Sequence, residues 1–475
     1  MKSSNKALVW FRRDLRLEDH TALAAAIAQG YEVIPVFVFD KIILDKIKDK
    51  KDLRLTFIYD SLKEIEEELI SHGSSLTILY GDPCTEIPNI AKELKAQKVF
   101  FNRDYEPYAI TRDNNVINEL KKLNIDVENF RDHVIFEGKD VVKNDGTPYK
   151  VFTPYSRAWL ARLQQNPQRL KKFKVTKSSF HIFNNKLSIS NFDWMNRIGF
   201  QYTENIFVKG GRSEALARLK KFKTKIYDYN HLRDFPSREG TSNISPYIRF
   251  GLISIRELVD ICAEGKNSGE KSWLNELIWR EFYQMILFNF PKVEKAAFKD
   301  EYNDIQWPTD NKIIEKWKLG ETGVPIVDAA MRELYLYGTM PNRLRMIVAS
   351  YFCKIMLQDW KVGEQYFADK LMDFDLAANN GGWQWSSSTG CDAAPYFRIF
   401  NPYAQSKKFD ADGEYIRRFC PELSHFSNKD IHAPHECDLL KQIEAKCKIG
   451  EDYPSPIVNY AVRREECLKL YKTIK

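Results

Sequence analysis

The residues best suited to chemistry gather in one stretch, which runs from residue 371 to residue 401. It combines small, polar and indole side chains, whereas a segment built only to fill a core would be richer in Leu, Ile and Val. This mixture suits a buried planar cofactor, because glycines allow close approach, acids and amides fix orientation, and indoles line the walls. A Trp-rich loop packed on a helical core would look the same, so both interpretations stay open here. The notable side chains are Asp373, Asp375, Asn379, Trp383, Trp385 and Asp392.

A second group lies in the helix-like segment SWLNELIWREFY, which begins at Ser272. Glu276 lies three residues before Trp279 and four before Arg280, so the three side chains share a helix face. A carboxylate, a guanidinium and an indole on one face suit a heteroaromatic base that stacks on Trp and bonds to Glu. An ordinary ion pair on an amphipathic helix, with Trp in the core, explains the same spacing.

Three further groups are ambiguous when each is taken alone. The hydroxyl-rich run from Thr241 to Ser245, with Tyr229 upstream, suits cofactor phosphates at a helix start but is also typical of a helix cap. Asn342 and Met346 share a helix face, although Met usually fills gaps in a core. Basic residues beside aromatic ones suit contact with a DNA backbone and an unstacked base. Basic residues scattered over the surface would look the same in the sequence. The basic candidates are Arg233, Arg343, Arg398 and Lys407–Lys408.

Length and composition limit the class of protein. A chain of 475 residues is expected to form about two domains, and its 44% hydrophobic and 29% charged residues are ordinary for a soluble globular protein. The net charge of +7 does not by itself identify a nucleic-acid-binding protein. The eight scattered cysteines include no CxxC pair, which indicates reduced thiols and no metal site. We find no signal peptide and no membrane-spanning run, so a cytoplasmic protein is expected.

Strand-like and helix-like segments alternate over the first 130 residues, which predicts a doubly wound parallel sheet. A small molecule is then expected beyond the carboxyl ends of the strands. No G-x-G-x-x-G follows the first strand and no G-x-x-x-x-G-K-[ST] occurs, which disfavours NAD-dependent chemistry and P-loop hydrolysis. The expected strands are 7–11, 32–39, 76–80, 98–102 and 125–130, and the expected helices are 21–29, 52–71, 86–96 and 111–123.

The periodicity becomes helical after residue 205, where no strand series is expected. The chain is therefore predicted to contain an α/β domain (1–130), a connector with a short helix near 155–164 (131–204), and an all-α domain (205–475). The expected helices of the last domain are 213–222, 253–262, 272–289, 311–317, 324–337, 342–357 and 362–367.

Taken together, these groups resemble the photolyase/cryptochrome family of flavoproteins, and most of all its bacterial class I cyclobutane pyrimidine dimer (CPD) photolyases. The similarity runs from VWFRRDLRLEDHTAL near the start to DYPSPIVNY near the end. Long blocks in the family's order make coincidence a poor explanation. The most specific blocks are RDFPSREGTSNISPY, WLNELIWREFY, GVPIVDAAMREL, NRLRMIVASYF and DLAANNGGWQWSSSTGCDAAPYFRIFNP.

The resemblance implies that the helical domain holds FAD in a bent conformation. Asn379 would lie beside flavin N5, Arg345 would pair with Asp373, and Gly381–Gly382 is assigned only to close packing. The implied FAD-binding residues are Tyr229, Thr241, Ser242, Asn243, Ile244, Ser245, Trp273, Arg280, Arg345, Asp373, Asp375 and Asn379. The implied electron-transfer chain is Trp307, Trp360 and Trp383. The implied catalytic residues around the lesion and flavin are Glu276, Trp279, Asn342, Met346, Asn379 and Trp385. The implied DNA contacts are Arg233, Glu276, Trp279, Arg343, Trp385 and Arg398.

The implied activity is light-driven repair of UV-damaged DNA that contains pyrimidine dimers. Reduced FAD would absorb blue or near-UV light and donate one electron to a flipped-out dimer, whose cyclobutane ring would then open. Asn342 and Met346 stand where (6-4) photolyases carry two histidines, so CPD splitting is expected. The alternative is a cryptochrome-like blue-light photoreceptor without repair activity; a DNA-binding protein without catalysis has little support. The protein is expected to act as a monomer in the bacterial cytosol, on nucleoid DNA, without a membrane partner.

One departure from the family pattern concerns a second, antenna chromophore. In the bacterial photolyases that the chain resembles, an Asn-Glu pair contacts a folate shortly after a Tyr-Glu. Here Tyr108 and Ala109 replace that pair, after Tyr105-Glu106. A folate is therefore in question, and a deazaflavin, another flavin or no second chromophore are the other possibilities.

Overall fold

The computed structural model describes residues 5–182 and 193–474, and its backbone forms two compact units. The first unit consists of Met1–Tyr149, Pro154–Thr224 and Ser242–Asn289, and the second of Lys150–Thr153, Lys225–Thr241 and Phe290–Lys475. These units divide the chain at other points than the segments expected from the sequence. The bounds of the α/β domain, connector and all-α domain therefore stay a prediction.

A five-stranded parallel sheet in the order β3-β2-β1-β4-β5 forms the centre of the first unit. The strand order changes direction between β1 and β4, as in doubly wound folds, which confirms the predicted fold class. The central strands are near-continuous hydrophobic runs because both of their faces are buried. The strands are β1 (Lys6–Phe11), β2 (Glu32–Asp40), β3 (Thr77–Gly81), β4 (Lys98–Asn102) and β5 (Asp126–Phe130).

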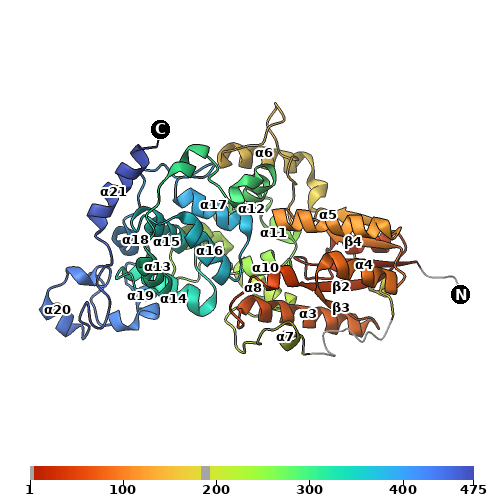
Figure 1. The fold of residues 1–475 in the computed structure, drawn as a ribbon, viewed down its shortest axis with the longest axis horizontal. Coiled ribbons are helices and arrows are strands. Elements are labelled where there is room, and N and C mark those ends of the chain that lie inside the picture. Colours follow the sequence, from red (N-terminus) through yellow and green to blue (C-terminus); the bar gives the residue numbers. More distant parts are fainter. Residues whose placement is uncertain (1–4, 183–192, 475) are drawn as a thin grey trace. The chain divides into compact units, whose positions relative to one another are not determined.

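Helices cover this sheet (Figure 1). Helices α4 (Pro83–Glu93) and α5 (Pro107–Lys122) share one hydrophobic cluster with alternate residues of the strands, including Leu8 and Trp10. Helix α1 (Thr21–Ala28) packs against β1, β2 and β4 without joining that cluster, so it covers the opposite face. The other helices up to residue 289 are α2 (Lys41–Leu44), α3 (Leu53–Ser71), α6 (Phe152–Gln165), α7 (Trp194–Arg197), α8 (Arg212–Lys223), α9 (Tyr229–Leu232), α10 (Ser245–Arg249), α11 (Ile255–Cys262) and α12 (Ser268–Asn289).

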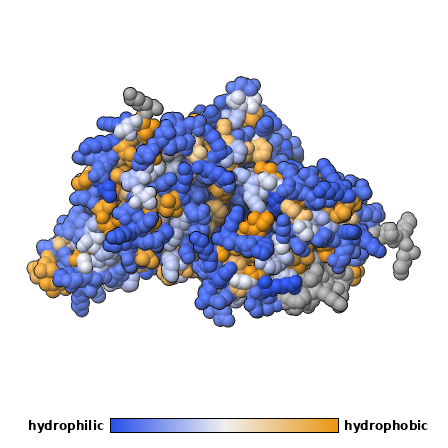
Figure 2. All heavy atoms as spheres, viewed as in Figure 1, coloured by the Kyte–Doolittle hydropathy of each residue, from blue (hydrophilic) through white to orange (hydrophobic). Residues whose placement is uncertain are grey.

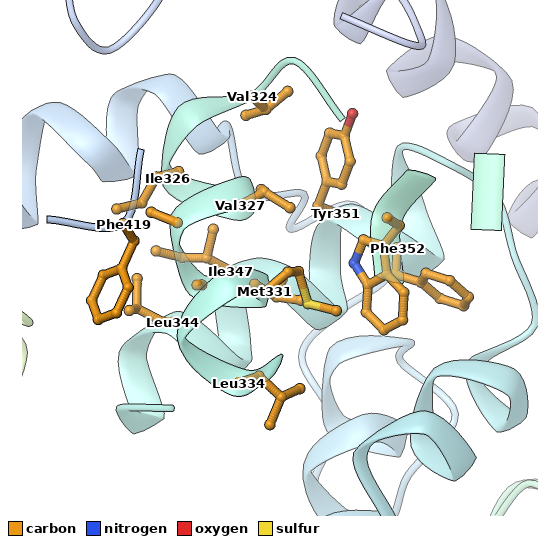
Figure 3. Close-up of a cluster of buried hydrophobic side chains, with 14 of the residues drawn as sticks. Val324, Ile326, Val327, Met331, Leu334, Leu344, Ile347, Tyr351, Phe352 and Phe419 are labelled. Atoms are coloured by element: carbon orange, nitrogen blue, oxygen red, sulfur yellow. The ribbon is translucent and has the colours of Figure 1, made fainter. Parts of the chain in front are cut away.

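The second unit is helical, and its core lies between α14 (Pro325–Tyr337) and α15 (Asn342–Lys354). Val327, Met331 and Leu334 follow the 3.6-residue period along α14 and pack in one cluster with Leu344 and Ile347 of α15 (Figure 3). The sequence periodicity predicted both helices to within a few residues. The other helices are α13 (Asn311–Leu319), α16 (Trp360–Lys370), α17 (Leu376–Ser386), α18 (Pro402–Phe409), α19 (Glu414–Phe419), α20 (Leu439–Glu444) and α21 (Tyr460–Lys472).

Helix α17 and the helices α18 to α21 after it differ from the sequence expectations, whose last helix is 362–367. Asp375 caps α17 by accepting a hydrogen bond from the backbone N–H of Ala378 (3.3 Å). Burial of Trp383 stabilises the helix against two glycines, each of which costs about 1 kcal/mol relative to Ala. A Cβ on Gly382 would meet no atom within 4 Å in the described chain, so its assignment to close packing is wrong.

Hydrophilic side chains predominate on the face drawn in Figure 2. An exception is α20, where Leu439, Leu440 and Ile443 are 57%, 66% and 64% exposed. Within residues 5–182 and 193–474, every helix is too short or too polar to span a bilayer.

Candidate active site

Helices α16 and α17 of the second unit pack against each other and carry candidate residues at matching intervals. Trp360 and Glu364 are four residues apart on α16, and Asn379 and Trp383 are four apart on α17, so each pair lies on one helix face. A Cβ on Gly363 would lie 2.1 Å from the Trp383 ring, so only glycine fits where the indole meets α16. The two helices therefore bring an acid, an amide and an indole together.

The amide of Asn379 is held in one orientation by Glu364. Its Nδ2 donates to the backbone carbonyl oxygen (3.0 Å) and to Oε1 (2.9 Å) of Glu364. Burial raises the pKa of the Glu364 carboxyl to about 7, although the bond from Asn379 acts in the opposite direction. Since both amide hydrogens point to Glu364, Asn379 offers its Oδ1 as an acceptor to a ligand. An acceptor of this kind suits the N–H that a reduced flavin carries at N5, and the place of Asn379 beside N5 stays a prediction.

Arg345 and Asp373 form the ion pair that the resemblance predicts. Nη2 of Arg345 donates to both carboxylate oxygens of Asp373, at 2.8 and 3.0 Å, and Nε donates to the carbonyl of Met340 at 2.7 Å. Asp375, two residues further on, is buried and caps α17. The pair thus ties the segment before α17 to α15, and the acids and guanidinium give that segment the hydrogen-bonding groups that a flavin and its ribityl chain require.

The three tryptophans of the expected electron-transfer chain have different surroundings. Trp360 and Trp383 are each 2% exposed, whereas Trp307 is partly buried and meets Tyr471 edge-on at a ring-centroid distance of 6.1 Å. Trp383 also contacts the buried Trp317, at a ring-centroid distance of 6.2 Å. Across the described residues, ring contacts do not join Trp307, Trp360 and Trp383 to one another, so their role as a chain stays a prediction.

Two further members of the expected lesion pocket lie at the start of α15. Asn342 is exposed and Met346 is partly buried, and Nδ2 of Asn342 lies 4.0 Å from the sulfur of Met346. Trp385, near the end of α17, contacts Phe400 at a ring-centroid distance of 6.4 Å. Asn342 and Met346 therefore share a face of α15, as their spacing predicts, and Trp385 packs against the loop that precedes α18.

The expected DNA contacts of the second unit already have partners within the chain. Nη2 of Arg343 donates to Asp234 (2.8 Å), and the guanidinium of Arg233 lies over the Tyr229 ring at 5.5 Å. Arg398 is exposed. These contacts orient the two partly buried arginines, and binding to DNA phosphates stays a prediction for all three.

Helix α12 of the first unit carries the other predicted group. Trp273 is buried against Phe222, and Trp279 meets Tyr283 at a ring-centroid distance of 5.5 Å. Nη1 of Arg280 donates to the carbonyl of His133 at 2.7 Å. Glu276 is partly buried on the same helix.

The residue after Arg280 has a role that the sequence analysis does not anticipate. Glu281 accepts hydrogen bonds from the backbone N–H groups of Ile135 (2.7 Å) and Phe136 (2.9 Å) and from Nε1 of Trp159 (2.5 Å). Burial raises the pKa of the Glu281 carboxyl to about 7, while these bonds act in the opposite direction. Glu281 therefore ties α12 to the segment around residue 135 and positions the helix that carries the predicted group.

The hydroxyl-rich run precedes α10, as expected of a helix start. Asn243 has a positive φ of 51°, and Ile244 is 1% exposed. Tyr229 begins α9 and is 8% exposed. Thr241 belongs to the second unit and Ser242–Ser245 to the first. Phosphate binding by this run stays a prediction.

The residues that replace the expected folate contacts pack within the first unit. The Tyr108 hydroxyl donates to Oδ2 of Asp40, which ends β2, at 2.8 Å, and Arg112 lies 3.4 Å from the same carboxylate. Ala109 is 3% exposed. Burial raises the pKa of the Tyr108 hydroxyl, and its bond to Asp40 acts in the same direction. This polar group lies where β2 ends, at the carboxyl edge of the sheet.

Two polar residues of the second unit are absent from the sequence predictions although the structure gives them defined contacts. Glu364 holds Asn379, and Lys354 donates to the backbone carbonyl of Arg398 at 3.1 Å. The four-residue interval between Trp360 and Glu364 places both on one helix face, and this spacing could have indicated Glu364. A single lysine inside the apolar run ASYFCKIML was the signal for Lys354.

The fold and this site define a protein in which a doubly wound α/β sheet is followed by helices that fit a flavin. A sequence model of the DNA photolyase family matches residues 7–173, and a model of the FAD binding domain of DNA photolyase matches residues 273–473. The chain is 38% identical to a deoxyribodipyrimidine photo-lyase of Alkalihalophilus pseudofirmus, over 99% of this chain and 98% of that protein.

Solved structures agree with these sequence matches. A bacterial class III photolyase from Agrobacterium tumefaciens superimposes with a TM-score of 0.90 and 32% identity, over 100% of this chain and 98% of that chain. An archaeal photolyase from Sulfolobus tokodaii with two FAD molecules gives a TM-score of 0.82 and 30% identity, over 99% and 100% of the two chains. The chain belongs to the DNA photolyase family, and FAD is its cofactor. Its assignment to class I stays a prediction.

Proposed function

We propose that the protein is a light-driven repair enzyme that splits cyclobutane pyrimidine dimers in UV-damaged DNA. The observation that carries this proposal is the α16–α17 pair, where Glu364 orients the Asn379 amide one turn from a buried Trp383. Membership of the photolyase family and relatives named deoxyribodipyrimidine photo-lyase support the reaction and the substrate.

The chain's own residues bind, orient and shield the reacting groups. When bound, FAD supplies the light-driven electron that opens the cyclobutane ring. Asn379 presents Oδ1 as a fixed acceptor, and the ion pair of Arg345 with Asp373 holds the segment that leads to it. Trp383 is 2% exposed, and this burial supports its proposed role of passing an electron to the cofactor away from water.

The damaged nucleotides are expected to leave the helix and to contact polar and aromatic side chains. Flipping costs a few kcal/mol, and least for a dimer that already stacks poorly, which favours the lesion over intact bases. Arginines that neutralise phosphates provide the part of the affinity that depends on salt. The residues proposed to contact the lesion are Glu276 and Trp279 of the first unit and Asn342, Met346 and Trp385 of the second, and the proposed phosphate contacts are Arg233, Arg343 and Arg398.

The decisive experiment is to photoreduce the purified protein, add DNA that contains a single CPD, and count dimers during illumination. We expect light-dependent loss of dimers and none in the dark. An intact flavin spectrum without loss of dimers would favour the cryptochrome-like alternative.

Glu276→Ala should lower repair because one hydrogen bond to a pyrimidine edge is lost. Unchanged repair in this variant would remove Glu276 from the residues proposed to contact the lesion.

The electron-transfer chain has its own test. Trp360→Phe should slow photoreduction and leave repair by enzyme that is already reduced unchanged, because only the first process needs an electron from protein. Equal losses in both assays would contradict the role of Trp360. Transient absorption of the oxidised protein provides the photoreduction rate.

A second chromophore is part of the same proposal. The structure of the photolyase from Sulfolobus tokodaii holds two FAD molecules, so a second flavin has a precedent in the family. Tyr108 and Ala109 stand at the folate-contacting positions, which makes a flavin or deazaflavin the better candidate. Extraction of the pigments from the purified protein, followed by mass spectrometry, identifies the second chromophore or shows one FAD per chain.

We also propose that the protein acts on DNA in the cytosol as a monomer. All eight cysteines, each within the described residues, are unpaired, which agrees with a reducing compartment. Sedimentation analysis of the free protein and of its complex with DNA tests the monomer.

A further inference from the structure

Lys354, the last residue of α15, is a buried lysine with an unusual partner. Its side chain is 1% exposed, and its Nζ donates to the backbone carbonyl of Arg398 at 3.1 Å. Burial lowers the pKa of the Lys354 ammonium to about 8, Cys467 and Cys353 act in the opposite direction, and Arg398 adds to the lowering. No carboxylate is among these groups. A buried ammonium without an acidic partner is disfavoured, so its retention requires an explanation.

A second residue of α15 holds the same loop. Oγ of Ser350 accepts a hydrogen bond from the backbone N–H of Phe400 at 3.4 Å. Ser350 and Lys354 are four residues apart, so they lie on one face of α15. Their two bonds reach the loop before α18 on either side of Ile399. This face of α15 therefore grips the loop backbone without using any of the loop's side chains.

The C-terminal helix α21 supports the loop through aromatic contacts. The ring of Tyr396 stacks on that of Tyr471, at a centroid distance of 5.9 Å and an interplanar angle of 7°. The Tyr471 hydroxyl in turn donates to the carbonyl of Ser387, which follows α17. Ile399 packs in the cluster that includes Tyr471. The loop is thus fixed by α15 and by α21.

Two side chains of this fixed loop project into solvent. Phe397 is 63% exposed, and Arg398 is also exposed although its carbonyl is held by Lys354. An exposed aromatic ring offers a stacking face to a base, and a neighbouring guanidinium offers a charge to a phosphate. A loop that presents both together suits DNA whose stacking is interrupted, and it loses less entropy on binding if its backbone is already ordered.

We propose that Lys354 is a positioning residue for damaged DNA: it holds the backbone at Arg398 so that Phe397 and Arg398 face the substrate together. The proposal rests on the proposed function, because it takes damaged DNA as the ligand of the loop. Lys354 itself does not touch the substrate. Burying the charge of Lys354 costs free energy. In return the protein gains an ordered loop rather than a more stable core.

The test compares Lys354→Met, which keeps most of the unbranched side chain and removes the donor, with the unmodified protein. In the free protein, hydrogen–deuterium exchange of residues 395–401 should rise about tenfold, as for loss of one charge-assisted hydrogen bond, while exchange in α14 stays the same. The dissociation constant for CPD-containing duplex should rise by a similar factor. The flavin spectrum should be unchanged and the melting temperature should not fall. A purely structural role of Lys354 would instead lower the melting temperature of the variant.

A double-mutant cycle shows whether Lys354 acts through the loop. In a Phe397→Ala, Arg398→Ala background, Lys354→Met should have no further effect on the dissociation constant. An equal effect in both backgrounds, or unchanged exchange of the loop, overturns the proposal. Ser350→Ala should also raise the exchange of the loop and the dissociation constant, by smaller factors than Lys354→Met. If Lys354→Met does not fold, Ser350→Ala tests the proposal in its place. Lys361→Met, on an exposed position of α16, is the matched control and should change neither.

The experiment also separates this inference from the proposed function. If the unmodified protein does not prefer CPD-containing DNA, the proposed function fails, yet loop exchange still reports whether Lys354 orders residues 395–401. If the preference is present and Lys354→Met retains full affinity with an ordered loop, only the role of Lys354 is overturned.

Discussion

Buried charges are arranged differently in a network of the first unit and around two groups of the second unit. In the first unit, Arg256 contacts both Asp19 (3.0 Å) and Asp132 (2.8 Å), and Arg16 contacts Asp132 at 2.6 Å. Each charge of this network has an opposite charge within hydrogen-bonding distance. In the second unit, Glu364 is held by an amide and Lys354 by a backbone carbonyl.

The pKa values follow this difference. Burial alone would raise the pKa of the Asp132 carboxyl, but Arg16 and Arg256 hold it well below its ordinary value. Burial raises the pKa of Glu364 to about 7 and lowers that of Lys354 to about 8, because no opposite charge compensates. A buried group therefore keeps its charge where an opposite charge lies beside it. Where none does, burial favours the neutral form. The paired network serves the fold, whereas the two lone groups hold residues of the candidate active site.

Arg256→Met should have the largest effect among the variants that test this comparison. It leaves Asp19 and Asp132 buried with less compensation, and we expect a loss of about 3–5 kcal/mol in unfolding free energy. Urea unfolding followed by circular dichroism measures it. A loss below about 1 kcal/mol would show that the network contributes no more than surface pairs do.

Glu364→Gln should change how stability depends on pH. The pKa of Glu364 in the folded protein is raised, so its favourable contribution is present below about pH 4.5 and is lost as the pH rises through about 7. The unmodified protein should therefore lose about 3 kcal/mol relative to the variant as the pH rises through this range. Unfolding curves at several pH values provide the comparison, and parallel profiles for the two proteins would contradict it.

Lys354→Met removes a buried cation, as Arg256→Met does, but the expected result is opposite. Because the pKa of Lys354 is lowered, its ammonium is disfavoured at pH 7, and the variant should be as stable as the unmodified protein or about 1 kcal/mol more stable. The stability of the unmodified protein should also rise, relative to the variant, between about pH 8 and pH 10.5. Marked destabilisation at pH 7 would place Lys354 with the structural charges.

Lys122→Met should have the smallest effect on unfolding free energy among these variants. Lys122 and Glu119 form an exposed pair at 2.7 Å, three residues apart on α5. Solvent screens such a pair, so the change in unfolding free energy should stay within about 0.5 kcal/mol. A larger change would mean that exposed pairs of this protein matter as much as Glu364 and Lys354, and the distinction between the paired network and these two groups would fail.

Local patterns in the sequence were enough for the sheet and most helices. β1, β2 and β4 are short hydrophobic runs bounded by polar residues, and α14 and α15 repeat apolar residues at the helical period, so their positions were predicted within a few residues. The family, and with it FAD and the pairing of Arg345 with Asp373, came from long matching blocks rather than from spacing. Helix α17 was missed because its glycines and polar residues disfavour a helix that tertiary burial of Trp383 stabilises.

The sequence by itself determined the fold class and the family, because these depend on local periodicity and on the order of motifs, and it supplied the residues predicted to surround the cofactor. Only the tertiary structure decided which atoms meet. Glu364 reaches Asn379 across 15 residues, and Lys354 reaches Arg398 across 44. Such contacts arise from how helices pack and where a loop crosses them, and neither is encoded in the spacing of neighbours along the chain.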